Sequence, residues 1–142
     1  MAANLSVRVS TLPISAHPRK RDFFVYEFKV DGYPFYVGIG RDRRATDRLR
    51  YVRSLMVPRN AGKLAKRSLS VRVMAALLRR GASIKLVCTR TPMNRSQALV
   101  REKQKIERLV AAGFLLTNWQ HNPRRHKNVS RAVRAIISGK RY

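Results

Sequence analysis

Acidic residues are scarce in this chain. Of its 142 residues, seven are Asp or Glu and 32 are Lys or Arg, which gives a formal net charge of +25 and an isoelectric point near 11.8. This excess of positive charge predicts a polyanionic partner, because binding to nucleic acid releases condensed counterions. The charge by itself is equally typical of DNA-binding proteins and of ribosome-associated proteins.

Cysteine and histidine are also rare. Cys88 is the single cysteine, so no disulfide can form within the chain, and its apolar surroundings predict a place in the core. His17, His121 and His126 have no partners at the spacing of zinc ligands. These counts argue against a disulfide-stapled scaffold and against a structural zinc site.

Long apolar runs are missing as well, since none approaches the roughly 18 residues of a membrane-spanning helix. With 44% hydrophobic residues, the chain can bury one modest core. We therefore expect one domain, no membrane partner and no secretion. In a bacterium or phage it would act in the cytoplasm or on the nucleoid, and in a eukaryote the mitochondrion or the nucleus is possible.

A β-hairpin is predicted around Asp31 and Gly32, because residues that favour extended structure flank this turn signal. A two-residue turn would place Tyr26 opposite Val37, whereas a three-residue loop would place it opposite Tyr36. Only the second register puts both phenols on one face, where two hydroxyls could reach one phosphate. The alternative is a core hairpin with ordinary amphipathic tyrosines.

The remaining patterns predict an α/β (α+β) fold with a small three-stranded central sheet flanked by helices. We expect Trp119 to be a core anchor rather than a base-stacking platform, and the C-terminal helix to pack on the core. The expected segments are an N-terminal arm or edge strand at 1–21, a main domain at 22–120 with helices at 42–55 and 62–80, a strand at 84–88 and a helix at 94–113, and a basic helical extension at 121–142.

The helix that follows Asn94 contains an acid in an unusual position. Asn94 and Gln97 form a capping-box pattern, and Gly113 is a stop signal. Glu102 falls inside the apolar arc, where an ionised carboxylate is costly unless it is paired or binds a metal. The simpler alternative is a partly buried Glu102 paired with an arginine. The arc itself consists of Ala98, Leu99, Ile106, Leu109 and Val110.

Two short motifs in the hairpin carry a resemblance to a known family. Val25-Tyr26 and Tyr36-Val37-Gly38 resemble the two halves of the GIY-YIG nuclease signature, with Phe24-Val25-Tyr26 in place of Gly-Ile-Tyr. The following Arg44 and the 98–106 helix segment are similar to the arginine and glutamate motifs of that family. The match is closest to the branch in which a histidine stands where this chain has Arg48.

The resemblance implies a metal-dependent endonuclease that hydrolyses DNA in a single-metal site. Tyr26, Tyr36, Arg44 and Glu102 would be catalytic, and Glu102 would hold Mg²⁺ or Mn²⁺. One phenol would help to deprotonate the attacking water, which requires the arginines and the metal to lower its pKa or orient the water. The supporting residues would be Gly38, Arg48 and Asn118.

The expected substrate is double-stranded or branched DNA, with RNA possible. Arg48 could supply a second phosphate contact in place of the histidine. The basic residues that we expect to contact nucleic acid are Arg41, Arg43, Arg48, Lys63, Lys66, Arg67, Arg124, Arg125 and Lys127.

A different class of function fits the same patterns. A non-catalytic nucleic-acid-binding protein with this fold would account for Arg48 and for Ile39, which occupies a position that is often lysine in the family. A ribosome-bound component would instead prefer RNA and have a stable place in a large particle.

Overall fold

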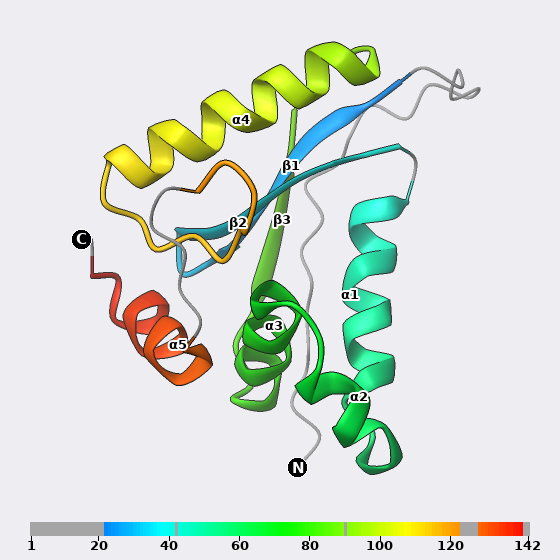
Figure 1. The fold of residues 1–142 in the computed structure, drawn as a ribbon, viewed down its shortest axis with the longest axis vertical. Helices are drawn as coiled ribbons and strands as arrows, with labels where there is room; N and C mark the ends of the chain where they lie inside the picture. Colours follow the sequence, from blue (N-terminus) through cyan, green and yellow to red (C-terminus); the bar gives the residue numbers. More distant parts are fainter. Residues whose placement is uncertain (1–21, 42, 90, 123–127, 141–142) are drawn as a thin grey trace.

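A computed structural model describes residues 22–41, 43–89, 91–122 and 128–140. They form an α+β fold in which a three-stranded antiparallel sheet, in the order β2-β1-β3, lies between helices (Figure 1). This confirms the expected sheet and its helical flanks, whereas the predicted arm at 1–21 lies outside the described residues. The elements are β1 Phe24–Val30, β2 Tyr33–Gly40, α1 Arg44–Leu55, a 3-10 turn Pro58–Asn60, α2 Ala61–Ala65, α3 Leu69–Arg79, β3 Ile84–Cys88, α4 Arg95–Ala111 and α5 Val129–Ser138.

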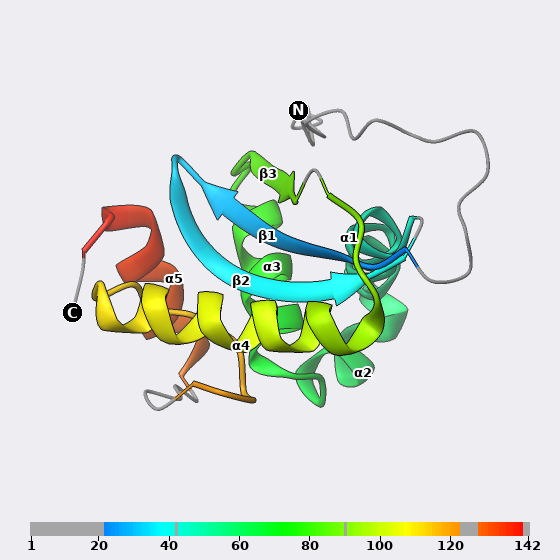
Figure 2. The ribbon, with the colours of Figure 1, turned by 90° about the horizontal axis from the view of Figure 1, so that it is seen from above.

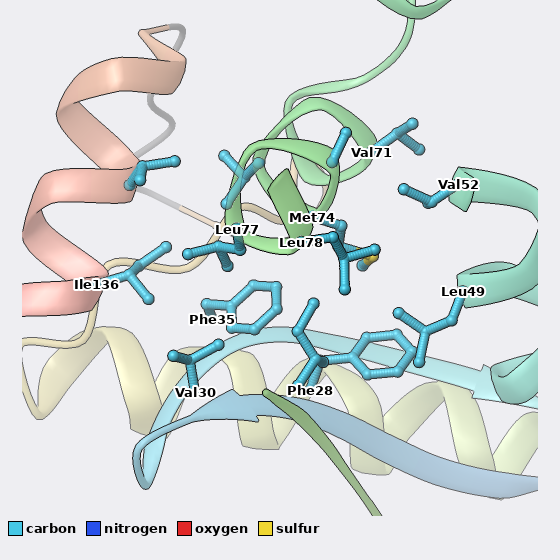
Figure 3. Packing of buried hydrophobic residues seen from close by; sticks show 14 of the residues in the cluster. Phe28, Val30, Phe35, Leu49, Val52, Val71, Met74, Leu77, Leu78 and Ile136 are labelled. Atoms are coloured by element: carbon cyan, nitrogen blue, oxygen red, sulfur yellow. The ribbon is translucent and has the colours of Figure 1, made fainter. Parts of the chain in front are cut away.

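Each face of the sheet has its own hydrophobic cluster. Helix α4 covers one face, and α1, α3 and α5 cover the other (Figure 2). Figure 3 shows the larger cluster, where Phe28 and Phe35 of the hairpin lie beneath Met74 and Leu77 of α3. No helix in the described part of the chain is long and apolar enough to cross a membrane.

Helix α4 begins and ends where the sequence predicts. The Asn94 side chain accepts a hydrogen bond from the Gln97 amide at 2.8 Å, and the Gln97 side chain accepts one from the Asn94 amide at 3.1 Å. Gly113 follows the helix with a φ of 90°, which suits glycine. One residue of the predicted apolar arc does not belong to the buried face of the helix, since Leu99 is 37% exposed.

Both hairpin registers predicted from the sequence are wrong. The turn does pair Val30 with Tyr33, as a two-residue turn requires, but a bulge between Phe28 and Lys29 then shifts the pairing by one residue. Phe35 is the additional residue on the bulged strand. Tyr26 therefore lies opposite Gly38, and Tyr36 lies opposite Phe28. The two tyrosines are diagonal neighbours on the same face of the sheet.

The helix expected at 62–80 is interrupted. Helix α2 ends at Ala65, and α3 begins at Leu69 after Ser68, whose φ of −57° and ψ of 159° are not helical. Serine favours such a position because its hydroxyl competes for the backbone groups of a helix end. The residues at this break, 67–70, line a cleft.

Helix α5 packs on the core, as expected, and joins the cluster formed by residues of the main domain. Its buried side chains are Ala132, Val133, Ala135 and Ile136, and Gly139 ends it in the left-handed conformation. The expectation that Trp119 anchors the core is wrong. Its side chain is 55% exposed, because the chain turns away from the core directly after the buried Asn118.

Two adjacent residues test the packing of α5. Ile136 is 1% exposed and Ile137 is 44% exposed, so Ile136→Ala should lower the free energy of unfolding by about 2–5 kcal/mol. Ile137→Ala should change it by less than about 0.5 kcal/mol. Urea unfolding measures both. Equal effects of the two substitutions would contradict the packing of α5 on the core.

Candidate functional site

Tyr26 and Tyr36 form a contacting pair on the sheet face that meets α1 and α3. Their ring centroids lie 6.3 Å apart, and a hydrogen bond joins their side chains. Tyr26 is 3% exposed, whereas Tyr36 is only partly buried. The pair thus presents one phenol toward solvent and holds the other behind it.

Gly38 makes room for the deeper phenol. A Cβ atom at this position would lie 2.6 Å from both Cζ and Oη of Tyr26, closer than real Cβ contacts allow. The φ of Gly38 is not positive, so the requirement for glycine is steric rather than conformational. The space at Gly38 is therefore occupied by the Tyr26 ring.

Both phenols are weaker acids here than a tyrosine in water. Burial raises the pKa of Tyr26 and of Tyr36, and the negative charge of Glu102 acts in the same direction. The charges of Arg48 and Arg44 lower both pKa values, as expected, but burial outweighs them. Both phenols are therefore neutral at neutral pH, and each can donate a hydrogen bond.

Arg48 connects the tyrosine pair to α3. Its guanidinium lies 4.3 Å from the centroid of the Tyr36 ring, and Nη2 donates a hydrogen bond to Ser70 Oγ at 2.8 Å. Its buried Nε has no hydrogen-bond partner within the described residues. Arg48 is thus a cation held beside Tyr36 with donor capacity left over.

Arg44 lies one turn before Arg48, at the start of α1. The Arg44 side chain is exposed. A Cβ atom on Gly40 would lie 2.9 Å from the Cβ of Arg44, so glycine at position 40 allows α1 to begin close to the end of β2. Arg44 is not part of the cleft lining, but its charge acts on both phenols.

Asn118 closes the free edge of β2. Its Oδ1 accepts a hydrogen bond from the Val37 amide at 3.0 Å, and its Nδ2 donates one to the Val37 carbonyl at 2.6 Å. The amide and hydroxyl of Thr117 both donate to the Phe35 carbonyl. Asn118 therefore supports the site through the backbone next to Tyr36.

A cleft of about 500 Å³ lies where these elements meet. Glu102 of α4 contributes the one acidic side chain of its lining, and Arg48, Arg67 and Arg72 contribute three cations. The other lining residues are Tyr36, Ser68, Leu69, Ser70, Thr117, Asn118, Trp119 and Gln120. Five segments of the chain thus meet at this cleft: β2, α1, residues 67–72, α4 and residues 117–120.

The Glu102 carboxyl group is partly buried, and its pKa is shifted by its surroundings. Burial raises its pKa, and the charge of His121 acts in the opposite direction. No side chain within residues 22–41, 43–89, 91–122 and 128–140 forms an ion pair with it. In a chain with 32 Lys and Arg residues, the expected alternative of a Glu102–Arg pair is therefore not found in the described residues.

Glu102 fits the chemistry of a hard divalent cation. Mg²⁺ is commonly held by one or two carboxylates, with water and substrate phosphate as its other ligands. The described residues contain no group of three or more His, Cys, Asp or Glu side chains that could hold a metal ion. Among the described residues, Glu102 could therefore hold a metal ion only as a single carboxylate ligand, as the sequence motifs imply.

Glu27 is a buried acid that the sequence reading overlooked. It is 5% exposed on the central strand, on the sheet face opposite Tyr26, and it pairs with Lys29 at 3.1 Å and Lys105 at 3.6 Å. Two lysines therefore satisfy Glu27, while Glu102, one turn before Lys105 on α4, has no such partner in the part of the chain described.

The basic residues predicted to contact nucleic acid occupy two regions along α1. Arg41 and Arg43 are exposed at its start, and Lys63, Lys66 and Arg67 are exposed near its end, on and after α2 (Figure 1). Of this set, only Arg48 and Arg67 line the cleft. Arg124, Arg125 and Lys127 lie outside the described residues.

Comparison with known proteins adds nothing to this geometry. No family model, curated protein or solved structure matches the chain.

Several cleft residues were missed in the sequence. Arg72 lines the cleft, and its buried Nε has no hydrogen-bond partner within the described residues. Ser68 and Ser70 also line it, and both fall inside the helix that the sequence predicts at 62–80. The signal available was Ser68 itself, a preferred N-cap residue beside a basic pair.

Gly38→Ala tests the tyrosine packing. Because the new Cβ would overlap the Tyr26 ring, the substitution should lower the free energy of unfolding by about 1–3 kcal/mol in urea titrations. The matched control is Gly62→Ala in α2, where nothing lies within 4 Å and alanine should be neutral or stabilising by up to about 1 kcal/mol. Equal stability of the two variants would contradict the close contact.

Glu102→Gln tests the unpaired carboxylate without any assay of activity. The pKa of Glu102 is higher in the folded protein than its ordinary value, so the protonated carboxyl group stabilises the folded state at acidic pH. This stabilisation is lost as the pH rises through the folded-state pKa. In the absence of divalent cations, the Gln variant should therefore be more stable than the wild type at pH 7. The difference should shrink toward pH 4.5, the ordinary pKa of the group.

Glu107→Gln is the control, since Glu107 is an exposed acid on the same helix and its loss changes the net charge equally. Adding Mg²⁺ should raise the melting temperature of the wild type and of Glu107→Gln, but not that of Glu102→Gln. Equal responses of all three proteins would show that Glu102 holds no metal.

Proposed function

We propose that this protein is a metal-dependent endonuclease that hydrolyses DNA phosphodiester bonds in a GIY-YIG-type single-metal site. The observation that carries the proposal is the cleft in which Tyr36, Arg48 and Glu102 meet. The same three positions belong to the motifs that resemble this family. Tyr26 and Arg44 act on that cleft through a hydrogen bond and through charge.

Glu102 is proposed to hold one Mg²⁺ or Mn²⁺ ion. When bound, such an ion neutralises charge on a phosphate oxygen and polarises the phosphorus–oxygen bond. The raised pKa of Glu102 reflects burial without an ion pair in the described residues, and a cation would relieve that cost.

Arg44 and Arg48 are proposed to stabilise the negative charge that grows on the phosphate in the transition state. Arg48 is held beside Tyr36 by its ring contact and by Ser70, so its orientation needs no change when substrate binds. Arg44 is exposed and can reach a phosphate from the rim. The arginine at position 48 thus takes the place of the family's histidine as a fixed cation.

Tyr36 is proposed to orient the attacking water, because it is the tyrosine that lines the cleft. Tyr26 lies behind it, and the hydrogen bond between the two side chains holds the Tyr36 hydroxyl in place. Tyr26 is therefore a positioning residue. With both pKa values raised by burial, the phenols work as oriented hydroxyls unless additional positive charge enters the cleft.

DNA is proposed to bind across the cleft and along α1. Arg41, Arg43, Lys63, Lys66 and Arg67 are exposed near the two ends of this helix, where they can contact successive phosphates. The net charge of +25 makes this affinity steeply dependent on salt. Such contacts position the duplex without reading its sequence.

A second candidate is a nucleic-acid-binding protein of the same fold that has no nuclease activity. Two observations favour it: burial raises the pKa of both tyrosines, and Arg48 already donates to Ser70. This protein would bind nucleic acid with the same salt dependence but would not respond to Mg²⁺.

Cleavage of supercoiled plasmid and of branched DNA with Mg²⁺ or Mn²⁺ distinguishes the two candidates. The wild type should nick DNA only with a divalent cation, and Glu102→Ala should abolish nicking. Arg44→Ala should lower the rate about 100-fold or more, because it removes charge stabilisation in the transition state.

The controls are Glu107→Ala on the solvated side of α4 and Arg50→Ala on α1, both exposed positions away from the cleft lining. Each should retain wild-type cleavage to within a fewfold. A wild type that binds DNA tightly but never nicks it with either metal would eliminate the nuclease and leave the binding protein.

A further inference from the structure

Trp119 stands at the rim of the cleft rather than in the core. It is 55% exposed, yet the four residues before it, from Leu115 to Asn118, are all buried. Single exposed apolar side chains are common on protein surfaces. This one is notable for its position, because its side chain shares the cleft lining with Tyr36 and Glu102.

The backbone that carries Trp119 is firmly held. Asn118 bonds to both backbone groups of Val37, and the Asn122 side chain donates to the carbonyls of Leu116 and Asn118. The exposed ring is therefore attached to a segment whose hydrogen bonds fix it against the edge of β2. A rigid support reduces the entropy that an aromatic side chain would lose on binding a ligand.

Cations line the same cleft. Arg67 follows α2, and Arg72 lies in the first turn of α3, with a buried Nε that has no hydrogen-bond partner within the described residues. Guanidinium groups bind phosphate well because several N–H donors are fixed in one plane. An aromatic face and arginines in one cleft match the two parts of a nucleotide, its base and its phosphates.

From this juxtaposition we propose that Trp119 stacks on an unpaired base of the substrate, while Arg67 and Arg72 bind the phosphates beside it. The proposal deepens the function proposed above, because it places this base next to the phosphate that Glu102 and Tyr36 face. Inside a continuous duplex, both faces of each base are covered by neighbouring bases. A base that reaches Trp119 must therefore come from a single strand, a fork or a junction.

The size of the cleft agrees with this substrate class. Its volume of about 500 Å³ falls within the range of pockets that enclose small molecules, roughly 300–1,000 Å³. A duplex can lie across the opening, but only an extruded or unpaired nucleotide can fill it. Stacking is tolerant of base identity, because every base has a π face.

Intrinsic fluorescence provides a direct test, since Trp119 is the single tryptophan of the chain. The wild-type protein, in EDTA so that no cleavage occurs, is titrated with a single-stranded oligonucleotide, a forked duplex and a blunt duplex of the same sequence. The single strand and the fork should quench the fluorescence, and the blunt duplex should not. An RNA single strand, run in parallel, shows whether the base must come from DNA.

Affinities of dye-labelled oligonucleotides provide the second measurement. Trp119→Ala should weaken binding of the single strand and the fork by about 5- to 150-fold, because stacking on one base is lost. Its affinity for the blunt duplex should stay within twofold of wild type. Trp119→Phe, which retains a smaller ring, should restore part of the loss, and Ile137→Ala, another exposed apolar residue, should change nothing.

The proposal is overturned if the blunt duplex quenches as strongly as the single strand, or if Trp119→Ala weakens all ligands equally. Should Trp119→Ala fail to fold, the wild-type quenching series and Trp119→Phe still decide the matter. Neither readout requires catalysis. A protein that shows the quenching pattern but never cleaves DNA would retain this base site and lose the nuclease assignment.

Discussion

The bulge at Phe35 determines which side chains the hairpin presents to the cleft. Before it, the odd-numbered Tyr33 and Phe35 face the larger cluster. After it, the even-numbered Tyr36 and Gly38 take that face, and Val37 turns toward α4. If the pairing before the bulge continued without interruption, Tyr36 would lie opposite Glu27, would face α4 and could not contact Tyr26. The stack with Arg48 and the space under Tyr26 both depend on this one shift in register.

Two acids on opposite faces of the sheet show how the scarce negative charge is used. Glu27 is more deeply buried, and two lysines compensate it, so it is a structural ion pair whose removal would leave uncompensated lysines. Glu102 is less buried but has no ion pair among the described residues. Of these two acids, the one without an ion pair in the described residues is thus the one that lines the cleft.

The sequence predicted what depends on local chemistry. The Asn94 capping box, the Gly113 stop and the three strands follow from short-range preferences, and each is confirmed. It could not predict the bulge, because one residue more or less in a strand changes no local preference. The sequence also did not predict that Glu27 is buried or that Trp119 is exposed. Glu27 is buried because it pairs with Lys105 of α4, and Trp119 is exposed because of the turn after Asn118. Both depend on tertiary structure. The roles of Arg44 and Glu102 remain predictions.

Helix α5 has a consequence for the order in which the protein matures. The hairpin and α1 are made first, but the cluster beneath α3 includes Ala132, Val133 and Ile136, which are made last. Because a domain generally folds as a unit, the wall of the cleft formed by α3 stays unsupported until α5 has left the ribosome. A polypeptide this basic emerges beside ribosomal RNA, and during that time it has charge but no finished cleft. The wall of the cleft is thus completed only after α5 has been synthesised.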